Sequence, residues 1–273
     1  MSLTSFLEHN ADVRAQFLAH FKKPDFRLKS PLLAPPLSES YGLVGTAFDY
    51  LLRFYVRKLN PGTKESPWVA DSGLRMLWAN SDTRRARKAI LLMAEAKRRY
   101  STFLKSSRTR PSPSLIEAAV WLASFDAVVR AGYLDAELTT RVPEILVKDL
   151  QRMLSLLPEE HFRAKKRCVL NPTFGRGSSL VGGADGDLII DDTLIDIKTT
   201  KHLTFDREFF NQLIGYYVLS RIGGIDDCAR GEIKHVAIYY ARYGVLHRVS
   251  LRECHEQSDL PNFLRWFQKR ARA

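Results

Sequence analysis

The chain has 273 residues, of which 45% are hydrophobic, 11% aromatic and 26% charged, and its formal net charge is +12. The apolar content fits a folded protein and not a disordered one, and the length is enough for one large domain or a core with an insertion. The excess of positive charge suits a polyanionic partner such as a nucleic acid.

Three cysteines lie far apart at positions 168, 228 and 254, with no CxxC pair. This spacing argues against a disulfide framework or a zinc site, and there are too few cysteines for a four-cysteine iron–sulfur cluster. Reduced thiols and a cytoplasmic location are the default expectation. No run approaches the roughly 18 apolar residues of a membrane span, so we expect no membrane partner.

The N-terminal third is expected to be helical. Residues 1–37 are predicted to form one amphipathic helix, over 2–21, followed by a proline-containing loop. Residues 38–66 form a second unit, whose helix stops at Asn60-Pro61-Gly62. Asp49 lies beside the apolar stripe of that helix, four positions before Arg53. An i,i+4 ion pair with Arg53 is therefore the alternative to a functional role for Asp49.

Residues 67–160 are predicted to be all helical, with helices at about 82–105, 114–131 and 143–156. Between residues 82 and 110, ten lysines and arginines face only Asp82 and Glu95. Such a stretch could follow the phosphates of a nucleic acid with salt-sensitive affinity, and Tyr100 and Phe103 could add base stacking. The alternative is an ordinary exposed helix face. The candidate nucleic-acid contacts are Arg84, Arg87, Arg98 and Arg99.

From residue 161 to 273 the chain becomes rich in strands, so the expected fold class is mixed α/β (α+β). Strands are predicted at about 168–174, 179–190, 193–199, 233–241 and 245–251, and helices at about 205–221 and 261–272. A second basic cluster, 163–167, comes directly before the first of these strands.

The most informative segment is a predicted β-hairpin with a two-residue turn at Asp191-Asp192. In that register Asp187 lies opposite Asp196, with Cβ atoms roughly 4.5–5.5 Å apart, and strand alternation places Asp185 and Lys198 on the same face. Facing carboxylates repel unless a cation neutralises them. The turn register decides between Asp187 and Asp185 as the ligand, since a one-residue slip would change the facing set, and an exposed hairpin with solvated acids is the alternative.

These residues and a pair further along the chain resemble the motifs of a known family. Asp187 with Asp196-Ile197-Lys198 resembles the PD-(D/E)xK nuclease signature, and Gln212 with Tyr216 resembles the QxxxY motif of its RecB-like branch. Residues 44–52 resemble the first core helix of that superfamily, in which Asp49 would be the acid. Two departures are that Gly186 stands where the nominal proline would be, and that the second acid is Asp rather than the commoner Glu.

The resemblance implies a restriction-endonuclease-like α-β-β-β-α-β core, with 38–66 as the first core helix, 67–160 as a helical insertion and 161–273 as the core sheet with flanking helices. It implies Mg²⁺, with Mn²⁺ as a substitute, held by Asp187, Asp196 and the Ile197 carbonyl. Asp49 is the first candidate for a further ligand, ahead of Glu117 and Glu39. Lys198 would position the attacking water, and Gln212 and Tyr216 would lie near the site.

We therefore expect a metal-dependent nuclease that hydrolyses phosphodiester bonds, with DNA favoured as substrate, through Asp187, Asp196 and Lys198. The alternative is a catalytically inactive nucleic-acid-binding module with a nuclease-like fold. A third hypothesis is a helical interaction protein with an incidental acidic hairpin. The sequence holds no helicase motif, so any coupled motor would be a separate partner protein.

Overall fold

The computed structural model describes residues 2–63, 67–80, 83–132, 134, 141–225, 232–256 and 258–272. The sequence-predicted helix start at residue 82 lies outside this set, as does Cys228. The fold is mixed α/β, with a five-stranded mixed sheet flanked by helices. No helix in these ranges is both long enough and apolar enough to cross a membrane.

The sheet follows chain order from one edge to the other. All neighbours are antiparallel except β3 and β4, which run parallel and are joined through helix α10 (Arg207–Gly223). Such a crossover is needed because a tight turn cannot join parallel strands. The strands are β1 (Cys168–Leu170), β2 (Leu188–Ile190), β3 (Thr193–Lys198), β4 (His235–Tyr240) and β5 (Val245–Ser250).

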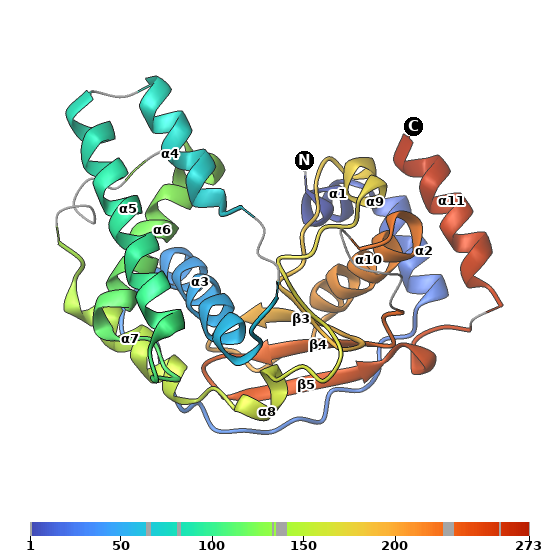
Figure 1. Ribbon diagram of the computed structural model, residues 1–273. Helices are drawn as coiled ribbons and strands as arrows, with labels where there is room; N and C mark the ends of the chain where they lie inside the picture. Colours follow the sequence, from blue (N-terminus) through green and yellow to red (C-terminus); the bar gives the residue numbers. More distant parts are fainter. Residues whose placement is uncertain are drawn as a thin grey trace.

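Apart from α8, the helices gather into two lobes with the sheet at their base (Figure 1). One lobe contains α3 (Tyr41–Leu59), α4 (Val69–Asn80), α5 (Thr83–Lys105), α6 (Pro113–Ala131) and α7 (Glu144–Ser155). The other contains α10 together with α1 (Leu3–His9), α2 (Ala11–His20), α9 (Arg176–Leu180) and α11 (Leu260–Arg272). The short α8 (Glu159–Phe162) precedes β1. We call the first group the helical lobe.

Strand alternation divides the interior into two hydrophobic cores, one on each face of the sheet. Ile195 of β3 and Tyr239 of β4 pack with the helical lobe, whereas Leu194 and Ile238 pack with α10 and the terminal helices. Asp196 and Lys198 share the parity of Leu194, so the sequence directs both toward α10.

The helical lobe is tied to the sheet by a buried ion pair. Arg242, in the β4–β5 turn, lies 2.7 Å from Asp149 of α7, and both side chains are at most 1% exposed. The same guanidinium donates hydrogen bonds to the carbonyls of Ala34 and Thr199. Thr199 directly follows Lys198, so this network anchors the end of β3.

Most predicted elements are confirmed within one to three residues, including the helices at 82–105, 114–131 and 143–156 and the closing helix. The single N-terminal helix over 2–21 is wrong. The chain leaves helical conformation at Asn10 (φ −119°, ψ 92°), whose side-chain amide donates to the Phe6 carbonyl. This local hydrogen bond competes with the helix and separates α1 from α2.

The continuous strand over 179–190 is also wrong. Residues 176–180 form α9 instead, and Gly182 and Gly183 follow with φ of 76° and 126°, which glycine adopts without strain. Gly177 lies within α9, where an added Cβ would sit 2.5 Å from the Leu219 carbonyl oxygen. The strand over 168–174 is shorter than predicted, because β1 ends at Leu170 and Asn171 adopts φ 51°.

Candidate active site

The turn between β2 and β3 has the predicted two residues. Ile190 pairs with Thr193, and the pairing continues to Leu188 with Ile195. Asp191 adopts φ 54°, and its carboxylate accepts hydrogen bonds from the main-chain NH groups of residues 165, 166 and 167. The second basic cluster is therefore tied to this turn through its backbone.

The hairpin register brings Asp187 and Asp196 together. The main-chain NH of Ile197 donates a 2.6 Å hydrogen bond to Asp187 Oδ2. Asp196 is only 4% exposed. Burial, reinforced by the negative charges of Asp196 and Asp49, raises the pKa of Asp187 well above its usual range, against the opposing effects of the Ile197 NH and Lys198. The site thus concentrates negative charge where water is largely excluded.

Asp185 occupies a different position from Asp187. It forms an isolated β-bridge with Thr173 and its side chain is exposed. Asp187 is held on both sides, since its carbonyl accepts from the Asn171 NH while its carboxylate accepts from Ile197. Of the two candidate acids, Asp187 is the one that the backbone fixes beside Asp196.

Lys198 is the cation of the site. Its Nζ lies 2.9 Å from Asp196 Oδ2 and donates a 3.0 Å hydrogen bond to Gln212 Oε1. Burial disfavours its charged form, but the charges of Asp196 and Asp187 outweigh this effect and raise the pKa of Lys198. The amine therefore stays protonated and acts as a positive charge rather than as a base. It also lies 4.7 Å from the centre of the Phe209 ring, a contact that the sequence analysis missed.

Gln212 and Tyr216 stand one turn apart on α10, so they share one face of that helix, and Gln212 contacts Lys198 of β3. The Gln212 amide nitrogen donates a 3.0 Å hydrogen bond to Tyr216 Oη. Burial raises the pKa of Tyr216, so its hydroxyl stays neutral. The two residues form a chain of hydrogen bonds that ends on the Lys198 ammonium, and they fix its position.

Asp49, on α3, is close enough to the site for its negative charge to act on Asp187. It contributes to the raised pKa of Asp187, yet its own carboxylate lies 2.5 Å from Arg53 Nη2. The i,i+4 pair is therefore present. The Arg53 side chain is 11% exposed and its guanidinium lies 4.5 Å from the centre of the Tyr50 ring. Gly45 allows α3 this close approach to the sheet, since a Cβ there would lie 3.2 Å from Thr199 Oγ1.

The other two acids considered as metal ligands are placed elsewhere. Glu117 makes a 3.2 Å ion pair with Arg99, and Glu39 is exposed just before α3.

The structure adds an acid that the sequence analysis missed. Asp126 of α6 is 2% exposed, its Oδ1 has no hydrogen-bond partner among the described residues, and its Oδ2 is 3.9 Å from Arg130. Burial raises its pKa to about 6. The sequence signal that could have identified Asp126 is an acidic residue within the apolar run 118–129. Arg53 links it to the site, because the charges of Asp49, Asp126 and Asp187 all act on that guanidinium.

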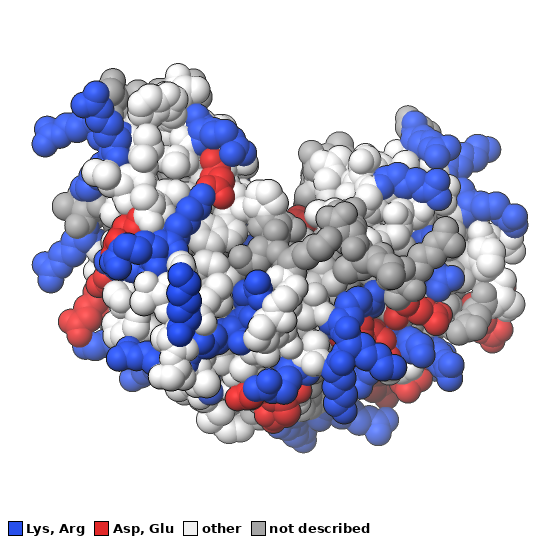
Figure 2. Space-filling view, viewed as in Figure 1, with Lys and Arg blue, Asp and Glu red and all other residues white. Residues whose placement is uncertain are grey.

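The predicted nucleic-acid contacts lie on α5, in the helical lobe. Arg84 and Arg87 are exposed near its start, while Arg98 and Arg99 lie in its second half. Lysine and arginine side chains are numerous on the visible face of this lobe (Figure 2). The stacking role for Tyr100 is wrong, because its ring lies in the core against Phe54, with centroids 4.2 Å apart. Phe103 is also buried, at 6% exposed, and offers no open platform.

Within the described ranges, no group of three or more His, Cys, Asp or Glu side chains is placed to hold a metal ion. Mg²⁺ does not need such a group, because proteins often bind it through one or two carboxylates and several waters. No protein-family model, curated protein or solved structure matches this chain.

Proposed function

We propose that the protein is a metal-dependent nuclease of the PD-(D/E)xK superfamily, RecB-like branch, that hydrolyses phosphodiester bonds in nucleic acid, with DNA as the expected substrate. The observation that carries the proposal is the convergence of Asp187, Asp196 and Lys198 on adjacent positions of one hairpin. Asp187 and the buried Asp196 share a single ammonium, and the raised pKa of Asp187 reflects the cost of holding both carboxylates ionised there. A substrate-binding cation would offset that cost.

The order of elements supports the same assignment. Helix α3, strands β1 to β3, helix α10 and strand β4 follow one another as in the α-β-β-β-α-β core of that superfamily, and α4 to α7 occupy the place of the insertion. Gln212 and Tyr216 lie on the α10 face beside Lys198, where the QxxxY resemblance requires them.

The residues present fit a Mg²⁺ or Mn²⁺ ion. Asp196 Oδ2 is buried beside the Lys198 ammonium, 2.9 Å away, and the acid pair concentrates hard oxygen donors. Asp187, Asp196 and the Ile197 carbonyl would hold the ion. When bound, a divalent cation lowers the pKa of coordinated water and offsets charge on the phosphate.

Lys198 is the side chain of the protein that would act directly on the reacting groups. Its protonated amine would stabilise the negative charge that develops on the phosphate oxygens, and it can hold the attacking water by a hydrogen bond. Asp196 and Gln212 fix the ammonium from two directions, so the charge needs no rearrangement during the reaction. Lys198 is the catalytic residue in this scheme, and Gln212 and Tyr216 are positioning residues.

The second candidate function is a nucleic-acid-binding module without catalysis. The pairing of Asp49 with Arg53 favours it, because a carboxylate already held by a guanidinium is a poorer metal ligand. Catalysis with Asp187 and Asp196 alone does not require Asp49.

The two functions are separated by incubating the purified protein with labelled linear, circular and single-stranded DNA. The nuclease hypothesis predicts degradation with Mg²⁺ or Mn²⁺ and none with EDTA. Binding without cleavage in any of these metal conditions would support the inactive module instead.

A further inference from the structure

We propose that a pocket between α5 and the start of α6 binds a backbone phosphate of the nucleic acid. This deepens the proposed function, since it takes nucleic acid as the ligand, but it does not depend on cleavage. The pocket, called here the α5–α6 pocket, has a volume of about 290 Å³. That size lies just below the range of roughly 300–1,000 Å³ typical of sites for drug-sized ligands, and it suits a phosphate with its sugar.

The charge of the α5–α6 pocket is strongly positive. Arg98, Arg99 and Arg108 line it, and among the described residues of its lining Glu95 is the only acid. Glu95 accepts hydrogen bonds from both Arg98 and Arg99, which lower its pKa to about 2, so it remains ionised. The lining therefore has two positive charges more than negative ones, and this excess falls to one when Glu117, which pairs with Arg99 from outside the lining, is included. A net positive charge is the electrostatic condition for binding a phosphodiester.

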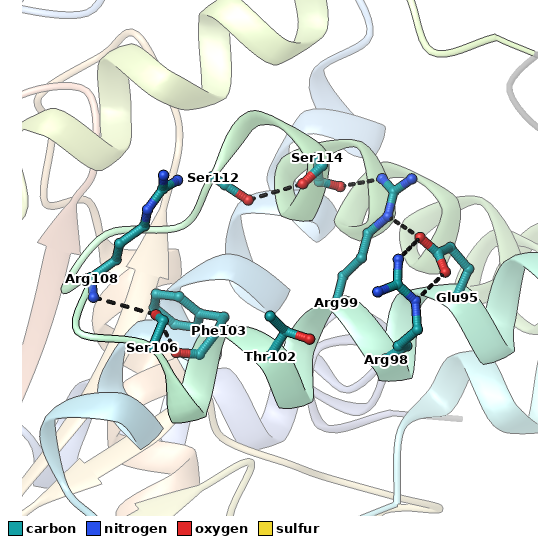
Figure 3. Close-up of a pocket in the computed structure, with 9 residues that line it drawn as sticks. All are labelled: Glu95, Arg98, Arg99, Thr102, Phe103, Ser106, Arg108, Ser112 and Ser114. Atoms are coloured by element: carbon teal, nitrogen blue, oxygen red, sulfur yellow. Dashed lines mark hydrogen bonds and ion pairs between the residues drawn. The ribbon is translucent and has the colours of Figure 1, made fainter.

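The guanidinium groups are arranged around the cavity rather than dispersed over the surface (Figure 3). Glu95 holds Arg98 and Arg99 side by side at one end, and Arg99 also donates to the Ser114 carbonyl. Arg108 lies at the other end. The side chain of Arg108 is exposed, and its guanidinium makes no hydrogen bond or ion pair with any described residue. A forked donor of this kind matches the oxygens of a phosphate.

Helix α6 adds neutral donors to the same cavity. Its N-cap, Ser112, accepts from the Leu115 NH, and the hydroxyls of Ser112 and Ser114 lie 3.0 Å apart on the pocket wall. Pro113 begins the helix, which runs for 19 residues. The positive end of its dipole therefore points toward the cavity that the arginines line, and this favours an anion there. The arginines and the N-terminal end of α6 therefore both favour an anion in the α5–α6 pocket.

The test measures binding in EDTA, where no cleavage occurs, so a failure of the nuclease hypothesis leaves it intact. A fluorescent single-stranded oligonucleotide is titrated with the wild type, Arg108→Ala and Arg152→Ala at several salt concentrations. Arg152 is an exposed arginine on α7 and serves as the matched control for the loss of one charge. Arg108→Ala should bind about tenfold more weakly and lower the slope of log K against log salt by about 1. Arg152→Ala should bind like the wild type.

Glu95→Gln is an independent variant, for which we expect the opposite change in affinity for the oligonucleotide. It removes the negative charge of Glu95 from the pocket lining, so the oligonucleotide should bind several-fold more tightly. Equal affinity for the wild type, Arg108→Ala and Glu95→Gln would overturn the proposal. A rise in the melting temperature of the wild type with inorganic phosphate alone, without any effect of Arg108→Ala on the oligonucleotide, would also overturn it and identify a small-anion site.

Discussion

The Lys198 ammonium donates a 3.0 Å hydrogen bond to the Gln212 side-chain oxygen across the gap between β3 and α10. Gln212 cannot lose or gain a proton, so it orients the ammonium without changing its charge. Asp196 holds the same group from the strand side at 2.9 Å. The geometry therefore assigns different tasks to the residues of this cluster, and these tasks can be separated by mutation.

Lys198→Ala should reduce cleavage by about 100-fold, the cost of removing one charge-stabilising donor from an active site. Gln212→Ala should reduce it by about tenfold, because the ammonium remains but loses its orientation. Neither change removes one of the proposed metal ligands, Asp187, Asp196 and the Ile197 carbonyl, so Mg²⁺ affinity measured by calorimetry should stay close to the wild type. Wild-type turnover in Lys198→Ala would count against its catalytic role.

Asp126 should make the stability of the protein depend on pH. Its pKa is raised to about 6 in the folded state, from 3.8 for the unperturbed carboxyl. Below pH 4 both states are protonated and the residue has no effect. Between pH 4 and 6 the unfolded chain ionises first, so stability falls, and above pH 6 the full loss is present. That loss is on the order of 2–3 kcal/mol.

Asp126→Asn removes this titration while keeping the shape of the side chain. Chemical denaturation at a series of pH values should show no difference between the variant and the wild type at pH 3.5, and a more stable variant above pH 6. A difference that stays constant across the whole pH range would show that the carboxyl ionises normally in the folded protein.

The buried pair of Arg242 and Asp149 should be costly to break from one side. Asp149→Ala leaves a guanidinium that is 1% exposed without its counter-charge, and the expected loss of unfolding free energy is about 3–5 kcal/mol. Replacing both residues by leucine should cost less than the sum of the two single leucine replacements, because no unpaired charge remains. Strictly additive losses in a double-mutant cycle would contradict this account.

The candidate site could be predicted from the sequence because local rules determine it. The two-residue turn at Asp191-Asp192 and the alternation of β3 are enough to place Asp187 beside Asp196 and to put Lys198 on the same face. The spacing of Gln212 and Tyr216 likewise places both on one side of a helix. Each of these relations spans fewer than about a dozen residues in the chain or follows from a regular periodicity.

Relations between distant segments were not accessible in this way. Arg242 and Asp149 are 93 positions apart, and nothing near either residue indicates a buried pair. The i,i+4 spacing showed that Arg53 could pair with Asp49, but not that the Asp126 charge also acts on its guanidinium, because that proximity depends on how α6 packs against α3. Tyr100 shows the same limit, since its position in a basic helix suggested nucleic acid while its ring packs against Phe54.

In the proposed function, the acid pair binds a divalent cation that supports phosphodiester cleavage. Asp196→Asn keeps the size of the buried side chain and removes one of the two charges, so the most direct measurement compares DNA cleavage by this variant and the wild type in Mg²⁺, after unfolding curves have shown both to be folded. We predict cleavage by the wild type alone, stopped by EDTA. Equal cleavage by the folded variant would contradict the site.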